Sequence, residues 1–198
     1  MRFLFILFIP LLFTVACSAN DDETAAKIDE EVQFPYSFPQ FDELDISEVR
    51  VSPRDGDAQE LSIAYTVSDD SAERALLDVD EEDQEKYDYR TIYGPYERDT
   101  VNLGIRQSPR PIGLREDVYS YDDSATLNSW PSIDVGESTL YFSYNEDLSG
   151  GMVQFMTEYK DTFYNVNIEE IGSNLTNREL EEKIEEIFLE IQDSYRKS

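Results

Sequence analysis

Apolar and polar residues alternate along much of the chain after residue 41. In ELSIAYTVSD (60–69) every second residue is large and apolar, and the residues between them are small or polar. Successive side chains of a strand point to opposite faces of a sheet, so this period of two predicts a strand with one buried face. The same pattern predicts further strands in the ranges 46–51, 87–93, 101–105, 138–145, 151–159 and 162–170.

Short segments that favour turns separate the predicted strands. Asp55-Gly56 and Gly94-Pro95 are two of them. Glycine, proline and aspartate suit tight turns, and strands joined by short turns pair antiparallel. We therefore expect an antiparallel sheet of about seven strands.

The C-terminal stretch LTNRELEEKIEEIFLEIQDSY (175–195) has a helical period instead. Thr176 is a suitable N-cap and Glu179 follows three residues later, which is the capping-box pattern of a helix start. Apolar residues recur every three or four positions and form one stripe: Leu180, Ile184, Ile187, Phe188, Ile191 and Tyr195. We expect this stripe to pack on one face of the sheet, and binding of a partner is the alternative. The predicted fold class is α+β, with a single domain over residues 41–198.

The chain begins with the pattern of a secretory signal peptide. Arg2 is followed by an apolar run over residues 3–15, which is shorter than the roughly 20 residues that a membrane span needs. Ala16 supplies the small residue before a cleavage site, so residues 1–16 are predicted to be removed. Cys17, the only cysteine of the chain, would then be the first residue of the mature protein.

Thr14-Val15-Ala16-Cys17 resembles the lipobox of bacterial, in particular Gram-positive, envelope lipoproteins. Thr14 stands where that motif usually has leucine, and a second basic residue near the start is missing. The resemblance implies that Cys17 carries a diacylglyceryl group with fatty acyl chains such as palmitate. Two acyl chains give stable attachment, so the protein would be lipid-anchored on the outer side of the cell membrane. An ordinary signal peptide with a chance cysteine is the alternative.

Residues 17–40 read as a linker between that anchor and the domain. SANDDETAAKIDEE is acidic and poor in large apolar residues, which predicts a disordered tether with a reach of about 25 Å. The stretch FPYSFPQF follows, and its two prolines favour an extended backbone. Its aromatic residues offer an alternative, in which this part docks on the sheet as a first edge segment.

The region 151–195 also resembles the C-terminal part of uncharacterised domains in Gram-positive envelope lipoproteins and anti-sigma-associated proteins. The resemblance lies in YKDTFYNVNIEE followed by LTNRELEEKIEEI and covers about a quarter of the chain. It implies a unit of strand, tight turn, strand and capped helix, and it transfers no functional residue.

The charge balance and the absence of histidine exclude several classes of function. The chain has 44 acidic and 16 basic residues, a formal charge of -28, and no histidine. Catalysis by Ser-His or Cys-His pairs and the usual zinc sites are excluded. Nucleic acid is not expected as a partner, because the acidic chain repels phosphates. We expect no cofactor.

Five arginines run against this charge balance in the range 90–115. Only Glu97 and Asp99 oppose them there. Guanidinium groups bind carboxylates and phosphates through paired hydrogen bonds, so the stretch is a candidate site for an anionic envelope polymer or an acidic partner. The alternative is that the arginines pair with acidic residues of neighbouring strands. The five are Arg90, Arg98, Arg106, Arg110 and Arg115.

Two acidic clusters, SDD (68–70) and DVDEEDQE (78–85), are candidate metal sites, and the second is the acidic loop considered further. Carboxylates gathered in one loop can bind calcium, and Asp78, Asp80 and Asp83 are the candidate ligands. The loop lacks the glycine and glutamate that an EF-hand needs at its sixth and twelfth positions. The alternative is a solvated acidic loop.

These observations predict a non-enzymatic, membrane-anchored lipoprotein that serves as an interaction or accessory module of the envelope, with an envelope protein as a candidate partner. A ligand or ion sensor that uses the arginine stretch or the acidic loop is the alternative. A hydrolase with two catalytic carboxylates is a second alternative, although no pair stands out among so many acidic residues.

Overall fold

The computed structural model describes residues 19–67, 75–97, 100–111, 130–145, 151–169 and 175–197. Its helices are α1 (Ala19–Glu31), α2 (Glu81–Lys86) and α4 (Asn177–Asp193). Its strands are β1 (Tyr36–Ser37), β2 (Leu44–Ser52), β3 (Glu60–Val67), β4 (Arg90–Tyr93), β5 (Leu103–Ser108), β6 (Ser132–Val135), β7 (Ser138–Asn145), β8 (Met152–Tyr159), β9 (Thr162–Glu169) and β10 (Tyr195–Arg196).

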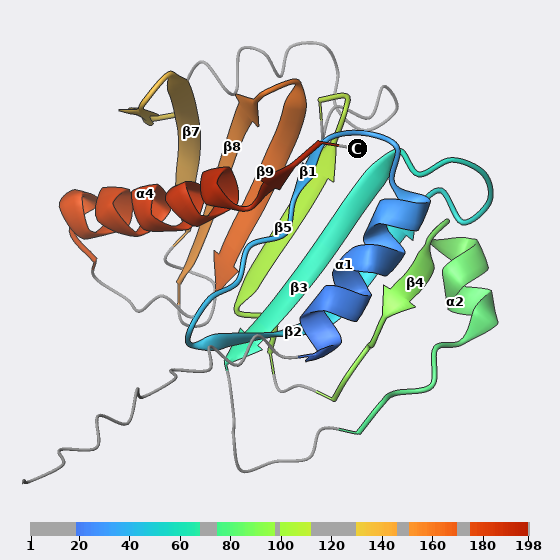
Figure 1. Cartoon of the computed structure of the whole chain (residues 1–198). Helices are drawn as coiled ribbons and strands as arrows, with labels where there is room; N and C mark the ends of the chain where they lie inside the picture. The colour runs from blue at the N-terminus through green and yellow to red at the C-terminus, as the bar shows by residue number, and fades with distance from the viewer. Residues whose placement is uncertain are drawn as a thin grey trace, which may run out of the picture.

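The strands form two antiparallel sheets. Eight of them form one sheet in the order β4-β2-β3-β5-β9-β8-β7-β6, and β1 pairs with β10 in a small second sheet. Figure 1 shows α1, α4 and the β1–β10 pair in front of the same face of the large sheet, which we call the inner face. The opposite side is the outer face.

The α+β class and the C-terminal helix are therefore correct, but the expected number of about seven strands is too low. The seven predicted ranges correspond to β2, β3, β4, β5, β7, β8 and β9. The three additional strands have only two to four residues each. Alternation needs several residues to be visible, so such short strands leave no clear pattern in a sequence.

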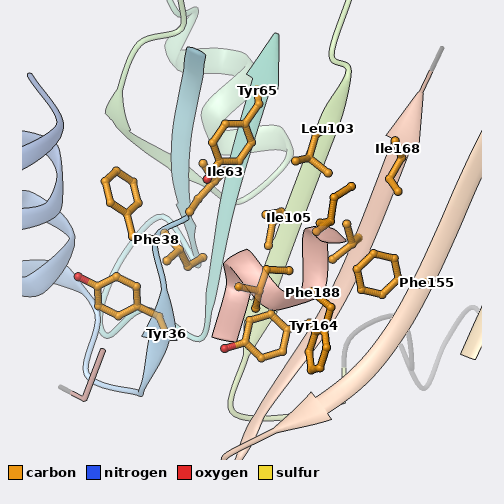
Figure 2. Close-up of a cluster of buried hydrophobic side chains, with 14 of the residues drawn as sticks. Tyr36, Phe38, Ile63, Tyr65, Leu103, Ile105, Phe155, Tyr164, Ile168 and Phe188 are labelled. Carbon is orange, nitrogen blue, oxygen red and sulfur yellow. The ribbon is translucent and has the colours of Figure 1, made fainter. Parts of the chain in front are cut away.

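The hydrophobic core lies between the inner face and the helices. Alternate residues of the central strands are fully buried there, for example Ile63 of β3, Ile105 of β5 and Phe155 of β8. Figure 2 shows these side chains together with Phe188 of α4. Helix α4 begins as predicted, because the Thr176 side chain accepts the Glu179 N–H and Glu179 in turn bonds the Thr176 backbone.

The N-terminal part of the described chain is not the disordered tether expected for residues 17–40. Residues 19–31 form α1, and Ala25, Ile28 and Val32 are buried in the core. These three residues lie three and four positions apart, which places them on one face of a helix. The many acidic residues around them lower the average hydrophobicity and hid this short stripe. Residues 1–16 and Cys17 lie outside the described residues, so the signal peptide and the lipid anchor stay predictions.

Residues 33–41, which we call the crossing segment, run over the inner face between α1 and α4. The Thr162 hydroxyl of β9 donates to the Pro35 carbonyl at 2.7 Å, and the Tyr65 hydroxyl of β3 donates to the Pro39 carbonyl at 3.0 Å. Phe34, Tyr36 and Phe38 are buried. The alternative of docked aromatics was thus the right one, although the segment crosses the sheet and does not extend its edge.

None of the helices in the described ranges combines the length and the apolar character that crossing a bilayer requires.

Candidate binding groove on the outer face

Strand register places a set of polar and small side chains together on the outer face. Arg50 of β2 pairs with Ser62 of β3, and Ser62 pairs with Arg106 of β5. Directly paired residues point to the same side of a sheet, so these three form a row. The next row contains Glu48, Ala64, Gly104 and Asn167 of β2, β3, β5 and β9.

These rows line an open groove of about 480 Å³. Its floor is formed by Ser62, Ala64 and Gly104, whose small or missing side chains leave space above the sheet. A Cβ atom placed on Gly104 would have no other atom within 4 Å, so the space above this residue is open. Val101, Met152 and Glu169 line the groove near one end of the sheet.

One wall of the groove is a fixed arginine on β2. The Nε atom of Arg50 donates to Glu48 Oε1 at 2.5 Å, and the guanidinium carbon lies 4.2 Å from the centre of the Tyr89 ring. The Glu48 side chain is only 4% exposed, whereas that of Arg50 is 37% exposed. The buried carboxylate and the aromatic ring therefore hold the arginine in place while part of it faces the groove.

Arg106 lies two strands away from Arg50 in the same row and is held in a similar way. Its Nε and Nη2 atoms donate to the two carboxylate oxygens of Glu60 at 3.0 and 2.7 Å. This fork-to-fork pair fixes the plane of the guanidinium group. The Arg106 side chain remains 42% exposed, so its other edge faces the solvent of the groove.

The five arginines of the predicted anion site do not form one site among the described residues. Arg90 lies on the inner side, paired with the buried Val51, and its guanidinium bonds Glu31 of α1 and the carbonyls of Pro53 and Arg54. Arg106 lies on the outer face. Arg110 is exposed after the end of β5, and Arg98 and Arg115 lie outside the described residues.

The three aspartates of the acidic loop do not converge on a common point. Asp80 is the N-cap of α2, and its Oδ1 atom accepts the N–H of Glu82 at 2.9 Å. Asp83 lies in the first turn of that helix, and Asp78 is exposed before it. Within the described ranges, no three acidic, histidine or cysteine side chains are grouped so that they could hold a metal ion.

A second hollow, of about 620 Å³, lies beside the β8–β9 turn and α4. The ammonium group of Lys160 lies 4.6 Å from the ring centres of both Tyr159 and Tyr195. The Tyr195 hydroxyl also donates to the Lys160 carbonyl at 3.1 Å. Lys160 thus occupies the space between the two aromatic rings, where a ligand cation would otherwise bind. Its contacts with Tyr195 attach the C-terminal strand β10 to the large sheet.

Sequence reasoning found only Arg106 among the groove residues. The alternation in ELSIAYTVSD predicted that Ser62 and Ala64 lie opposite the buried face, but alternation does not reveal which strands are neighbours. Arg50 and Glu48 come next to Ser62 and Ala64 only through the pairing of β2 with β3. A glycine inside the alternating range 101–105 was the one available signal.

Comparison of the chain with protein-family models, with curated proteins and with solved structures returns no match.

Proposed function

We propose that this protein is a non-enzymatic, lipid-anchored binding module of the bacterial cell envelope, and that its partner binds in the outer-face groove. The observation that carries this proposal is the glycine–alanine pair, Gly104 and Ala64, in adjacent central strands. Both residues are poor strand formers. A glycine inside a strand often marks a place where a ligand or another backbone comes close.

The shape of the groove supports an extended segment of a protein partner. The lining residues come from five adjacent strands, β2 to β8 in the order of the sheet. Four steps of about 4.8 Å between strands give a length of about 19 Å, enough for five or six extended residues. The groove is open along this length, so a chain can lie across it without threading through the protein.

The chemistry of the groove supports a polar partner that carries both hydrogen-bond donors and acceptors. Arg50 and Arg106 offer donors, and Asn167 and Glu169 offer acceptors. Each arginine already has a carboxylate partner, and the whole chain repels polyanions. An uncharged or mixed-charge segment of an envelope protein therefore suits the groove better than an anionic polymer.

The pairing of Glu48 and Glu60 supports a role without catalysis, because it leaves Glu169 as the one other carboxylate among the lining residues that the structure describes, and hydrolysis by carboxylates needs two. Both oxygens of Glu60 accept hydrogen bonds from Arg106, and Glu48 is buried beneath Arg50. A catalytic carboxylate needs an oxygen that can reach a substrate or a water molecule. The lipid anchor itself is inferred from the motif around Cys17.

Crosslinking in intact cells tests this proposal. Tagged wild-type protein is compared with Gly104→Val, which fills the groove, and with Ser132→Val, which makes a similar change on the exposed strand β6. Valine suits a strand, so both variants should keep the thermal midpoint of the wild type. Mass spectrometry should identify one membrane-associated partner with the wild type and Ser132→Val, and lose it with Gly104→Val. Equal capture of that partner by all three proteins would contradict the proposal.

A second variant separates the anion-binding alternative from the proposed one. Arg106→Met removes one guanidinium group but keeps the apolar stem of the side chain. An anionic ligand would be lost from this variant and would bind more weakly as salt increases. A polar peptide segment should instead tolerate salt and lose only part of its affinity.

A further inference from the structure

We infer that the folded domain rests directly on the bilayer, through the end of the sheet where α1 begins, with Leu76 and Leu77 in the lipid interface. This inference rests on the proposed lipidation of Cys17. A flexible tether would have held the domain away from the membrane. The inference instead places the domain in contact with the membrane and states which end of it faces the lipid.

The first argument is the length of chain between the anchor and the fold. Helix α1 begins at Ala19, only two residues after Cys17. Two extended residues span at most about 7 Å. The helix cannot move away freely, because Ile28 and Val32 are buried in the core. A lipidated Cys17 therefore holds the start of α1 close to the lipid headgroups.

The second argument is the direction of α1. Its last residue, Glu31, bonds Arg90, which pairs with Val51 near the end of β2. The helix has 13 residues and is therefore about 20 Å long. Its first residue lies toward the opposite end of the sheet, where β2 begins and β3 ends. Figure 1 shows the dark-blue start of α1 at this end.

The third argument is the position of exposed apolar side chains. Val67 (59% exposed) ends β3 and pairs with Leu44, the first residue of β2. Leu76 (65% exposed) bridges to Tyr96, whose N–H bonds the Ser47 carbonyl near the start of β2. Leu77, next to it, is also exposed. Only Tyr87 and Leu189 are comparably large and exposed apolar side chains elsewhere in the described residues.

The charge of this end determines which lipid it tolerates. Asp22 and Glu23 in the first turns of α1, and Asp42 and Glu43 before β2, are exposed. These carboxylates repel an anionic leaflet, and salt screens that repulsion over about 10 Å at 0.1 M. A zwitterionic bilayer is therefore the partner that this end of the domain suits, and the acyl chains of Cys17 hold the domain against it.

Depth-dependent fluorescence quenching tests the inference with the full lipidated protein. Because Cys17 is acylated, Leu76→Cys introduces the single free thiol, which is labelled with an environment-sensitive dye. Leu189→Cys, on the exposed side of α4, is the matched control. In phosphatidylcholine vesicles the dye at position 76 should shift to the blue and lose fluorescence when nitroxide-labelled lipid is added. The dye at position 189 should change in neither respect.

Two further measurements separate the possible failures. Mass spectrometry of the N-terminal peptide establishes whether Cys17 is acylated, and an unmodified cysteine would overturn both the proposed function and this inference. Acylated protein whose dye at position 76 behaves like the dye at position 189 overturns only the membrane contact. Insertion of about twenty Gly/Ser residues between Ser18 and Ala19 gives a reach of about 25 Å and should abolish the blue shift. The blue shift should also be smaller in vesicles that contain anionic lipid. A blue shift that is unchanged by the insertion and by anionic lipid would contradict the inference.

Discussion

The side chain of Gln107 holds the backbone of Ser37 as a neighbouring strand would. The Ser37 N–H donates to Gln107 Oε1 at 2.6 Å, and Gln107 Nε2 donates to the Ser37 carbonyl at 2.8 Å. Gln107 lies in the central strand β5 and is fully buried. One amide side chain thus satisfies both backbone groups of Ser37 in the middle of the core, which lets the crossing segment pass over the sheet.

Replacement of Gln107 by leucine should therefore be strongly destabilising. Leucine keeps the volume but leaves the Ser37 N–H and carbonyl buried without partners, at a cost of about 1–3 kcal/mol each. Urea denaturation should show this as a lower midpoint. Gln59→Leu, at an exposed position just before β3, is the control and should change the free energy of unfolding by less than about 0.5 kcal/mol. Similar values for the two variants would contradict the role assigned to Gln107.

Alkaline pH should destabilise the protein through two buried tyrosines. Burial is the main cause that raises the pKa of Tyr164, whose hydroxyl lies 2.9 Å from Ser37 Oγ. Burial, assisted by a hydrogen bond to Asp29, likewise raises the pKa of Tyr36. In the unfolded chain both hydroxyls lose their protons near pH 10, while the folded protein keeps them. The stabilisation is therefore complete below about pH 10 and is lost as pH rises above it.

Each of these tyrosines should contribute a slope of about 1.4 kcal/mol per pH unit above pH 10. Tyr164→Phe should show a shallower loss of stability than the wild type between pH 10 and pH 11.5. Tyr87→Phe, at a side chain that is 60% exposed, should follow the wild type. Denaturant titrations at a series of pH values measure the slopes. A wild-type slope in the Tyr164→Phe protein would mean that this hydroxyl ionises in the folded state as easily as in water.

The sequence predicts the larger strands and the C-terminal helix because each of them has its own local period. Long strands such as β3 and β8 alternate over eight residues, and α4 combines a capping box with an apolar stripe. The crossing segment has no such period. Its position depends on side chains such as Gln107 and Tyr65, which lie far away in the sequence. Local pattern does not encode these contacts.

The candidate groove was less predictable than the fold for a related reason. Its residues come from strands that are far apart in the sequence, and only the order β2-β3-β5-β9-β8 brings them together. The cluster of arginines in the range 90–115 made Arg90 and Arg106 equal candidates for one anion site. Register separates them, because Arg90 pairs with the buried Val51 and Arg106 pairs with Ser62 on the outer face.

Helix α1 should be an integral part of the domain, which a single substitution can test. Ile28 is fully buried in the core, so Ile28→Ala should lower the free energy of unfolding by about 2–5 kcal/mol. Glu30→Ala, on the exposed side of the same helix, should have an effect below about 0.5 kcal/mol. A chain that starts at residue 42 lacks both α1 and the crossing segment, and it should fail to show a cooperative thermal transition. Equal stability of the Ile28→Ala protein and the wild type would mean that α1 does not pack on the sheet in solution.

Arg90 and Arg106 should differ in what their removal costs, because one supports the fold and the other lines the groove. Arg90 Nη1 donates to the carbonyls of Pro53 and Arg54 at 2.7 and 2.9 Å, and its Nη2 bonds Glu31 at 2.5 Å. Arg90→Met leaves these partly buried acceptors unpaired and should cost about 2 kcal/mol. Arg106→Met breaks an ion pair that solvent screens, and it should cost less than about 1 kcal/mol.

Urea denaturation of the two variants, carried out beside the partner-capture assay, decides between these roles. The expected result is a clear loss of stability for Arg90→Met with capture per folded molecule unchanged, since Arg90 lies on the inner side of the sheet. Arg106→Met should remain as stable as the wild type within about 1 kcal/mol and should capture less partner. If Arg106→Met were the more destabilised of the two, the ion pair of Arg106 with Glu60 would be a structural contact. Arg106 would then stabilise the fold and would have no assigned role in binding.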